Sequence, residues 1–409
     1  MDLRVPHGWQ RQPVWMALTP TKRTGHVTEE VLSVYRDHGV IPKSSRSDNH
    51  NRTPENLDAY QLVEPGDVVF NKMKAWSGSV GVSEHRGIVS GDYLVCRTDG
   101  ATVDRRFLHY LLRSRPFFEE YARRSTGIRP SQWRLYWEEL SQLDLPLPNL
   151  DDQRRIANYL DCETGRMDRA VAASGKQLMR AEERLAAEAA TLLHVDDGVP
   201  FTPFPGAAPR GYIPLWLAAK TFSGKTLQSE QAQESEQETP YLKASNIGYE
   251  EVELTGLDTM WASPTECAEL RIREGDVFVI EGGATAGKAA HLLEEPDHLT
   301  ILQNHVHCVR ASDGFSQRYL YWVLRAYYGS GWYPVITSAV TFGSFPAMKL
   351  RALPVPNLDP HAQEATVATL DGHLTALHAV RERTESFRQL LNERKQALIT
   401  AAVTGEITV

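Results

Sequence analysis

Two long stretches of the chain repeat apolar or small residues at helical spacing. The first stripe consists of Leu160, Met167, Val171, Ser174, Leu178, Ala181, Leu185 and Leu192, and the second of Leu370, Leu374, Leu377, Val380, Thr384, Phe387, Leu391 and Leu398. Neighbouring members lie three, four or seven positions apart, which places each stripe on one face of a helix. No proline interrupts residues 151–199. The sequence therefore predicts two helices of roughly 40 residues, each roughly 60 Å long.

The segments in front of these helices have a different pattern, typical of mixed α and β structure. Gly66-Asp67 and Gly275-Asp276 each precede a short apolar run of the kind found in buried strands. A helix-like stretch follows later in each segment, at 105–113 and 317–325. A Leu-Pro-x-Pro motif ends both segments, because proline removes a backbone donor and disfavours helix in the residue before it.

The order of motifs shows that the chain contains two copies of one unit, each about 205 residues long. Pro6–Trp9 is echoed by Pro209–Tyr212, Glu64–Val69 by Arg273–Phe278, Phe107–Arg113 by Tyr319–Arg325, and Leu145–Asp151 by Leu353–Asp359. The order is kept throughout, and the offset stays near half the chain length. We therefore predict two globular domains, at 1–150 and 199–356, each followed by a helical region, at 151–198 and 357–409.

A single amphipathic helix of this length is not stable in water, so each apolar stripe needs a partner surface. The simplest arrangement pairs the two stripes as an antiparallel coiled coil, with one globular domain on each helix. The alternative is that each stripe packs on its own globular domain. The predicted fold class is α+β, with two repeated domains of mixed α/β structure and two paired helices.

Composition narrows the functional classes only slightly. The 409 residues are 42% hydrophobic and 23% charged, as in ordinary globular proteins. No apolar run approaches the roughly 18 residues of a membrane span, and the first nine residues lack the apolar stretch of a signal peptide. We expect a cytoplasmic protein without a membrane partner. The four cysteines form no CxxC pair, which gives no sign of a zinc knuckle.

The net charge of −8 argues mildly against nucleic acid, because domains that bind it are usually basic. Any DNA contact must therefore come from local basic clusters, since electrostatic attraction is screened over about 8 Å at physiological salt.

One glycine-rich stretch, residues 282–288, fits the GxxxxGK pattern of a phosphate-binding loop. The next residue is Ala289, so the hydroxyl that would hold magnesium is missing, and the first repeat has no equivalent Gly-Lys. The other interpretation is a tight turn between strands. His305 and His307 could share a strand face, but such a pair is more often packed or exposed than metal-binding. We expect neither catalytic nor metal-binding residues, which favours recognition or assembly.

Several motifs resemble the DNA-specificity subunit of type I restriction-modification systems. They are Asp151–Asp161 (Asp-Asp-Gln-Arg-Arg-Ile-Ala-Asn-Tyr-Leu-Asp), Arg394–Ile407 near the end of the chain, Val31–Val34 with Asp37–Val40, Asn71–Lys74 and Pro240–Ile247. Together with the repeat and the Leu-Pro-x-Pro motifs, the likeness covers nearly the whole chain. In the second copy the Gln-Arg-Arg-Ile run is replaced by Gln363–Thr366 (Gln-Glu-Ala-Thr), which suggests that the two partner-binding regions differ.

The resemblance implies a subunit that does no chemistry itself. Each globular domain would be a target-recognition domain that reads one half of a bipartite double-stranded DNA sequence. The helices would set the spacing and dock methyltransferase subunits, which we expect in two copies, and restriction/translocase subunits would join through the complex. S-adenosylmethionine, ATP and magnesium would then bind the partner subunits, and this chain would carry no cofactor.

Candidate DNA-binding residues are basic or amide side chains in polar, glycine-rich surroundings. They are Arg46, Arg52, Lys72, Lys74, Arg129 and Arg134 in the first domain, and Lys225, Lys243, Asn246, Lys288 and Lys349 in the second. Arg and Lys can bond guanine O6 and N7, Asn can bond adenine N6 and N7, and the cations can equally sit on phosphates or remain solvated. Two other functions stay open: a coiled-coil assembly scaffold without sequence preference, and a nucleotide-binding enzyme that uses residues 282–288.

Overall fold

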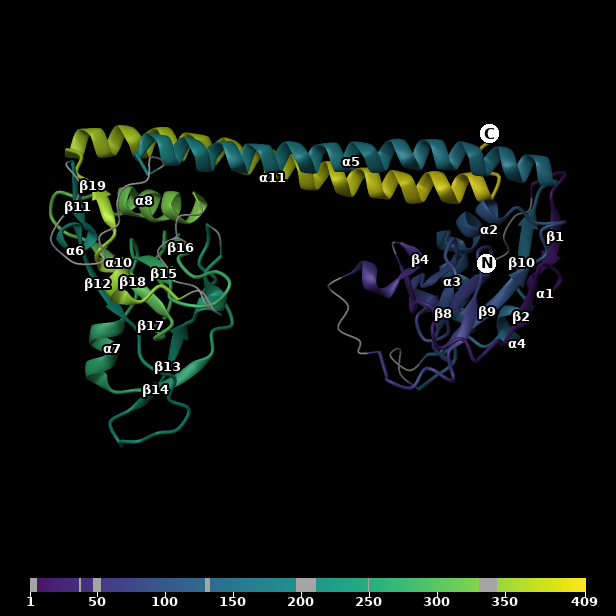
Figure 1. The fold of residues 1–409 in the computed structure, drawn as a ribbon, viewed down its shortest axis with the longest axis horizontal. Coiled ribbons are helices and arrows are strands. Elements are labelled where there is room, and N and C mark those ends of the chain that lie inside the picture. The colour runs from purple at the N-terminus through teal and green to yellow at the C-terminus, as the bar shows by residue number, and fades with distance from the viewer. Residues whose placement is uncertain are drawn as a thin grey trace. The chain divides into compact units, whose positions relative to one another are not determined.

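A computed structural model describes residues 6–36, 38–46, 53–128, 133–195, 211–248, 250–330 and 344–409. The chain divides into two compact units (Figure 1): unit 1 is Met1–Ser174 with Glu385–Val409, and unit 2 is Gly175–Thr384. Two long helices, α5 (Leu150–Leu192) and α11 (Pro360–Val403), pass through both units. Their lengths, 43 and 44 residues, agree with the helical periodicity of the sequence.

The globular domain of unit 1 is built on a four-stranded antiparallel sheet in the order β2-β9-β6-β7. These strands are β2 (Leu18–Thr21), β6 (Val68–Asn71), β7 (Val80–Val82) and β9 (Tyr93–Thr98). Three antiparallel pairs complete it: β1 (Gln10–Pro13) with β10 (Asp144–Leu147), β3 (Leu32–Tyr35) with β4 (Gly39–Pro42), and β5 (Gln61–Val63) with β8 (Gly87–Val89). Its helices are α1 (Val14–Ala17), α2 (Arg105–Leu112), α3 (Arg115–Arg124) and α4 (Trp137–Leu140).

The globular domain of unit 2 repeats this plan, which confirms the duplication predicted from the sequence. Its four-stranded antiparallel sheet runs β12-β18-β15-β16, formed by β12 (Ala219–Ser223), β15 (Val277–Ile280), β16 (Ala289–His291) and β18 (Val306–Ala311). β11 (Tyr212–Pro214) pairs with β19 (Pro354–Pro356), and β13 (Gln237–Leu242) lies between β14 (Thr259–Ala262) and β17 (Ile301–Leu302). Its helices are α6 (Leu215–Ala218), α7 (Pro264–Leu270), α8 (Gln317–Gly329) and α10 (Ala347–Arg351).

The Leu-Pro-x-Pro motifs form β10 and β19, which pair with the first strand of their own domain. The chain thus closes each domain where it began and then enters a long helix. Local capping explains why the helices start there. The Asn149 side chain accepts the backbone N–H of Asp152 at 2.9 Å, and Asp359 accepts that of Ala362 at 2.9 Å. Pro360, the first residue of α11, has no N–H that would need a partner.

The apolar stripes of the long helices are buried in two ways at once. In unit 1, Leu160 of α5 and Ile399 of α11 share one core with the globular domain. In unit 2, Leu185 of α5 and Leu374 of α11 do the same. Early residues of one helix thus meet late residues of the other within each unit, which makes the pair antiparallel. The stripes therefore pack both against each other and on the globular domains.

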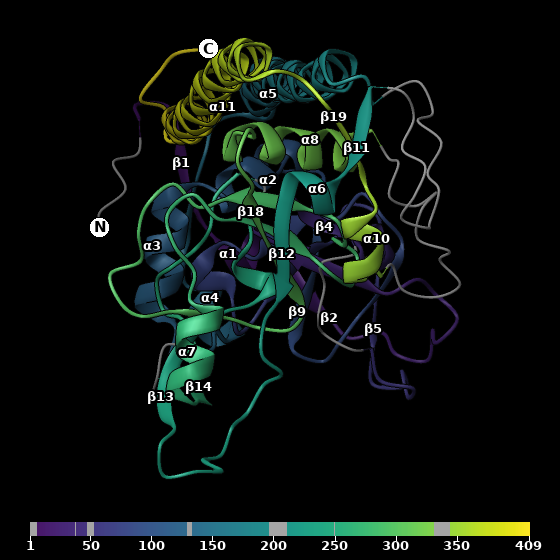
Figure 2. The same ribbon diagram turned by 90° about the vertical axis from the view of Figure 1, so that its left-hand side faces the viewer.

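Helix α8 lies between the sheet of unit 2 and the helix pair, as two views of the ribbon show (Figures 1 and 2). The side chains of Tyr319, Trp322 and Tyr327 on this helix are almost completely buried in the unit 2 core. The Ser316 side chain caps the helix by accepting the backbone N–H of Tyr319. In unit 1, α2 is capped by Asp104 and buries Phe107, Leu108, Leu111 and Leu112 in the core that α5 and α11 share.

Candidate nucleic-acid interface

In unit 1 the structure brings together two of the predicted basic residues that lie 62 positions apart in the sequence, Lys72 and Arg134. Lys72 follows β6, and its carbonyl accepts the backbone N–H of Leu135 at 2.9 Å. Arg134 forms an ion pair with Asp92 at 3.4 Å, while the Lys72 ammonium donates to the carbonyl of Gly91 at 2.8 Å. A local basic cluster thus exists on this domain, beside the loop that joins β6 to β7.

The electrostatics of this cluster follow from its partial burial. Burial lowers the pKa of Lys72, and the nearby positive charges of Arg134 and Lys22 add to the effect, while Asp92 opposes it. Two tryptophans, Trp76 and Trp133, meet edge to face with ring centroids 5.8 Å apart. Aromatic rings next to cations are common where proteins contact nucleic acids, although such rings also serve simply to pack a loop.

The other candidates of the first domain have varied surroundings. Lys74 is exposed at the start of the short helix Ala75–Ser77. The Arg46 guanidinium lies over the ring of Tyr35, 4.9 Å from its centroid. Arg52 and Arg129 lie outside the described residues.

One of the five candidates of the second domain lines an open depression of about 380 Å³, and three others bond or adjoin residues near it. Lys243 lines it, together with Gly282, Gln303 and His305. Lys225 forms a β-bridge with Gln303, and Lys288 donates to the carbonyl of Ile247, beside Asn246, at 3.2 Å. Lys349, the fifth candidate, is half-buried on α10.

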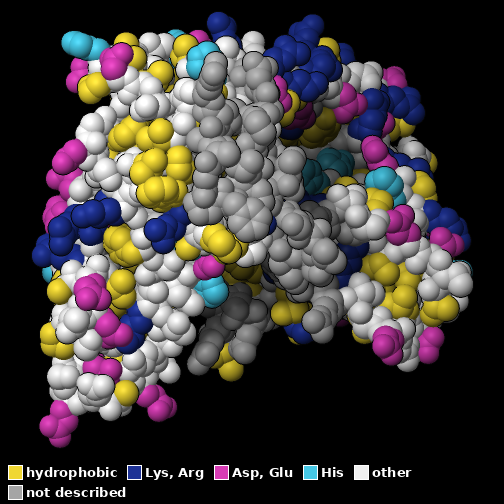
Figure 3. Space-filling model, turned by 60° about the vertical axis from the view of Figure 1, so that its left-hand side comes forward, with side chains coloured by type: hydrophobic (Ala, Val, Ile, Leu, Met, Phe, Trp, Pro, Cys, Tyr) yellow, Lys and Arg dark blue, Asp and Glu magenta, His cyan; other side chains and the backbone are white. Residues whose placement is uncertain are grey.

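Most of these side chains already have partners within the domain. Lys225, whose side chain is only 12% exposed, forms an ion pair with Glu266 and lowers the pKa of that carboxyl. Lys243 forms an ion pair with Asp258, and the Asn246 side chain accepts the backbone N–H of Lys243 at 3.2 Å. Internal ion pairs reduce the positive charge that is available to a phosphate, so the region is less basic than its number of lysines implies. On the face in Figure 3, basic and acidic side chains are likewise interspersed.

The phosphate-loop interpretation of residues 282–288 is wrong. This stretch connects β15 to β16, two antiparallel strands of one sheet, and a strand rather than a helix begins at Ala289. Gly283 and Gly287 have φ of 89° and 86°, a left-handed backbone that favours glycine. A phosphate loop depends on the N-terminus of a following helix, and here that position is occupied by β16. The alternative interpretation, a tight turn, is confirmed.

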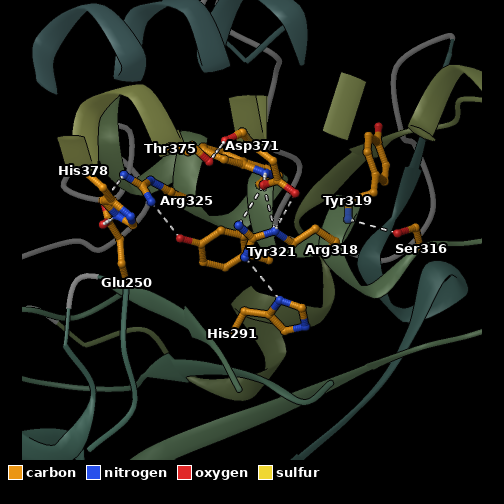
Figure 4. A network of polar contacts seen from close by, with 11 residues as sticks. Glu250, His291, Ser316, Arg318, Tyr319, Tyr321, Arg325, Asp371, Thr375 and His378 are labelled. Atoms are coloured by element: carbon orange, nitrogen blue, oxygen red, sulfur yellow. Dashed lines mark hydrogen bonds and ion pairs between the residues drawn. The ribbon is translucent and has the colours of Figure 1, made fainter. Parts of the chain in front are cut away.

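Polar contacts that the sequence did not predict attach each globular domain to its long helix. Figure 4 shows this network in unit 2, where side chains from α8 and α11 converge. Gln363, which is 1% exposed, donates to the carbonyls of Gly314 and Leu358 and accepts the backbone N–H of Ser316. In unit 1, Gln153 donates to the carbonyls of Thr102 and Pro148 and accepts the N–H of Asp104. The sequence contained a signal for these contacts, because the two glutamines are 210 positions apart and therefore occupy equivalent places in the two repeats.

Buried charges strengthen the network in unit 2. Burial raises the pKa of the Glu250 carboxyl, but the hydrogen bond with His378 and the charges of Arg325 and Arg381 outweigh it, so the pKa is lowered. The pKa of His291 falls to about 4, first because of burial and then because of the Arg318 guanidinium. The Arg318 side chain donates to Nδ1 of His291 at 3.2 Å, which suits a neutral imidazole.

Among the residues that the structure describes, no three His, Cys, Asp or Glu side chains are grouped in a way that could hold a metal ion. Within the same ranges, none of the helices combines the length and apolar character needed to cross a membrane.

The fold defines a class of protein: two repeated α/β domains, each closed by a Leu-Pro-x-Pro strand and carried on one of two antiparallel helices. Solved structures of this class exist. The chain superimposes on a protein in a structure of type I R-M complex assembly and conformational transition with a TM-score of 0.68 and 18% identity, covering 99% of this chain and 100% of that one. It superimposes on the HsdS subunit from Thermoanaerobacter tengcongensis with a TM-score of 0.51 and 17% identity, covering 99% and 98%. No protein-family model and no curated sequence matches the chain. The chain thus has the fold of these type I R-M structures over its whole length.

Proposed function

We propose that this protein is the DNA-specificity subunit of a type I restriction-modification complex. Each globular domain reads one half of a bipartite double-stranded target, and the chain itself catalyses no reaction. The observation that carries this proposal is the duplicated architecture, with one recognition-type domain in each unit, on a fold shared along its whole length with HsdS. A protein with two equivalent reading domains suits a target with two separate halves.

The two long helices would set the distance between the half-sequences and dock the methyltransferase subunits. Apolar side chains near the middle of both helices remain exposed, among them Met179 (51%) on α5 and Leu390 (64%) on α11. We expect these side chains to form part of the docking surface, where the methyltransferase subunits would cover them. Two methyltransferase subunits and, through the complex, restriction/translocase subunits would be the partners. They would carry S-adenosylmethionine, ATP and magnesium.

DNA contact would come from the basic cluster around Lys72 and from the rim of the depression near Lys243. Phosphate contacts position such a protein, while a few base contacts specify the sequence. The ion pairs of Lys225 and Lys243 make these two lysines weaker candidates for phosphate binding than the exposed Lys74.

An assembly scaffold without sequence preference is the rival function, and one experiment separates the two. The chain is combined with its methylation partners, and the modified adenines in genomic DNA are mapped. We expect methylation at one bipartite sequence. Exchanging residues 201–352 for the same region of a relative should change only one half of that sequence. Methylation without sequence preference, or a simultaneous change in both halves, would refute the proposal.

A further inference from the structure

One aspartate on α11 holds helix α8 of unit 2. Asp371 accepts Nε1 of Trp322 at 2.8 Å and Nε of Arg318 at 2.9 Å, and Nη2 of Arg318 lies 2.7 Å from the same carboxylate (Figure 4). The Trp322 side chain is fully buried in the core of the unit. A charged acceptor on the long helix is thus bonded to a rigid aromatic group and to a guanidinium of the globular domain.

Unit 1 contains the corresponding contact, in which only the aromatic donor is of a different type. Asp161 on α5 accepts the hydroxyl of Tyr110 at 2.7 Å and Nη1 of Arg106 at 2.8 Å, and both donors belong to α2. The aspartates are 210 positions apart, and both the arginines and the aromatic donors are 212 apart. The position of the aspartate contact is therefore repeated, although tyrosine has replaced tryptophan as the aromatic donor.

Unit 2 has a second attachment between its globular domain and α11. The Glu250 side chain, 7% exposed, forms ion pairs with Arg325 of α8 at 2.7 Å and with Arg381 of α11 at 3.2 Å, and it also bonds His378 of α11. A buried carboxylate that receives three cationic or polar partners is held in one geometry. Glu250 thus joins a loop of the globular domain directly to the long helix.

In unit 1, Arg113 occupies the position that corresponds to Arg325. Arg113, 212 positions before Arg325, donates to the backbone carbonyls of Val80 at 2.8 Å and of Arg36. These hydrogen bonds join α2 to its own domain. A groove of about 1,570 Å³, lined by Arg113, Arg36 and Asp168 among others, lies between α2 and the helices in unit 1.

We propose that Asp161 and Asp371 are positioning residues that set the angle at which each recognition domain is held on its helix, and that they thereby enforce the spacing between the two half-sequences. This inference rests on the proposed function. In unit 2, Glu250 supports the same orientation as Asp371, so the loss of the Asp371 charge is partly compensated.

The solvent exposure of these ion-paired side chains determines how much the loss of one aspartate charge should cost. The side chains of Asp161 and Arg106 are 41% and 48% exposed, and those of Asp371 and Arg318 are 37% and 21% exposed. Exposed ion pairs contribute little to folding stability. Loss of an aspartate charge should therefore leave the domain folded and loosen only its orientation.

The experiment measures methylation by the full chain assembled with its methylation subunits. The substrates are DNA duplexes that carry both half-sequences and differ in the spacer by one base pair. For Asp161→Asn we expect the preference for the native spacer over its neighbours to fall about fivefold, as for the loss of one partly exposed charged contact. For Asp371→Asn we expect a smaller fall, which becomes as large as that of Asp161→Asn when Glu250→Gln is added.

Asp151→Asn is the matched control, because its side chain is 93% exposed on the first turn of α5 and forms an ion pair with Arg154 of the same helix. It should keep the native spacer preference. Hydrogen exchange of the α2 amides, measured in the same complexes, should become faster in Asp161→Asn alone.

An Asp161→Asn complex that loses activity equally on all spacers, or that keeps the native preference, would overturn the positioning role. A wild-type complex without any bipartite preference would instead remove the proposed function, and this inference with it.

Discussion

The buried glutamines at the start of the long helices allow the strongest stability prediction. In Gln153→Leu the side chain keeps nearly the same size but loses three hydrogen bonds, which join α5 to Thr102, Asp104 and Pro148 at 2.8–3.2 Å. Gln153 is 1% exposed, so water cannot replace its partners. At about 1 kcal/mol for each lost bond, and more for a backbone group left unpaired, the free energy of unfolding of unit 1 should fall by about 3–4 kcal/mol.

The assay is denaturant unfolding followed by tryptophan fluorescence, with the midpoint and slope determined for each variant. Gln363→Leu should cause a loss of similar size in unit 2, because Gln363 makes the same three contacts. Gln177→Leu is the control, since Gln177 is exposed on α5. A loss below about 1 kcal/mol in Gln153→Leu, with Gln177→Leu unchanged, would refute the view that this glutamine holds the domain on the helix.

Three further predictions concern pH, DNA affinity and helix length. The pKa of His291 is about 4, below the value of roughly 6.5 in an unfolded chain. The folded state therefore favours the neutral imidazole, so stability is unaffected above pH 6.5 and falls by at most about 3 kcal/mol as the pH drops towards 4. His291→Gln should flatten that decline in unfolding experiments; an unchanged pH profile would contradict the assignment. In the assembled complex, Lys74→Ala should weaken binding of all DNA sequences alike and reduce the salt dependence by about one ion, whereas Lys225→Ala should mainly destabilise its domain by removing the ion pair with Glu266. Titrations at several salt concentrations check this, and a sequence-specific loss in Lys74→Ala would argue for a base contact. Four residues inserted after Gln177 lengthen α5 by about 6 Å and rotate its far end by about 40°, so the methylated sites should have a spacer about two base pairs longer. Two inserted residues rotate it by about 200° and should impair assembly. An unchanged spacer in an active four-residue variant would show that the helices do not set the spacer length.

The candidate DNA contacts show what a sequence pattern cannot determine. Lys225 is a plausible phosphate ligand by residue type, yet the fold places it beside Glu266, 41 positions away. Lys72 and Arg134 come together because the chain returns to the end of β6, where the backbone N–H of Leu135 bonds the carbonyl of Lys72. Whether a basic side chain can contact DNA depends on the side chains around it in space. Those neighbours are distant in the sequence.

The sequence by itself determined the duplication, the two long helices and the Leu-Pro-x-Pro motifs at which each globular domain ends. These features follow from local rules: helical periodicity, proline and asparagine or aspartate at helix starts, and glycine in turns. Only the tertiary structure decided that the apolar stripes pack on the domains as well as on each other. It alone also decided that Asp161 and Asp371 bond α2 and α8. Such contacts join residues about 50 positions apart, and their formation depends on the packing of whole elements rather than on local preference.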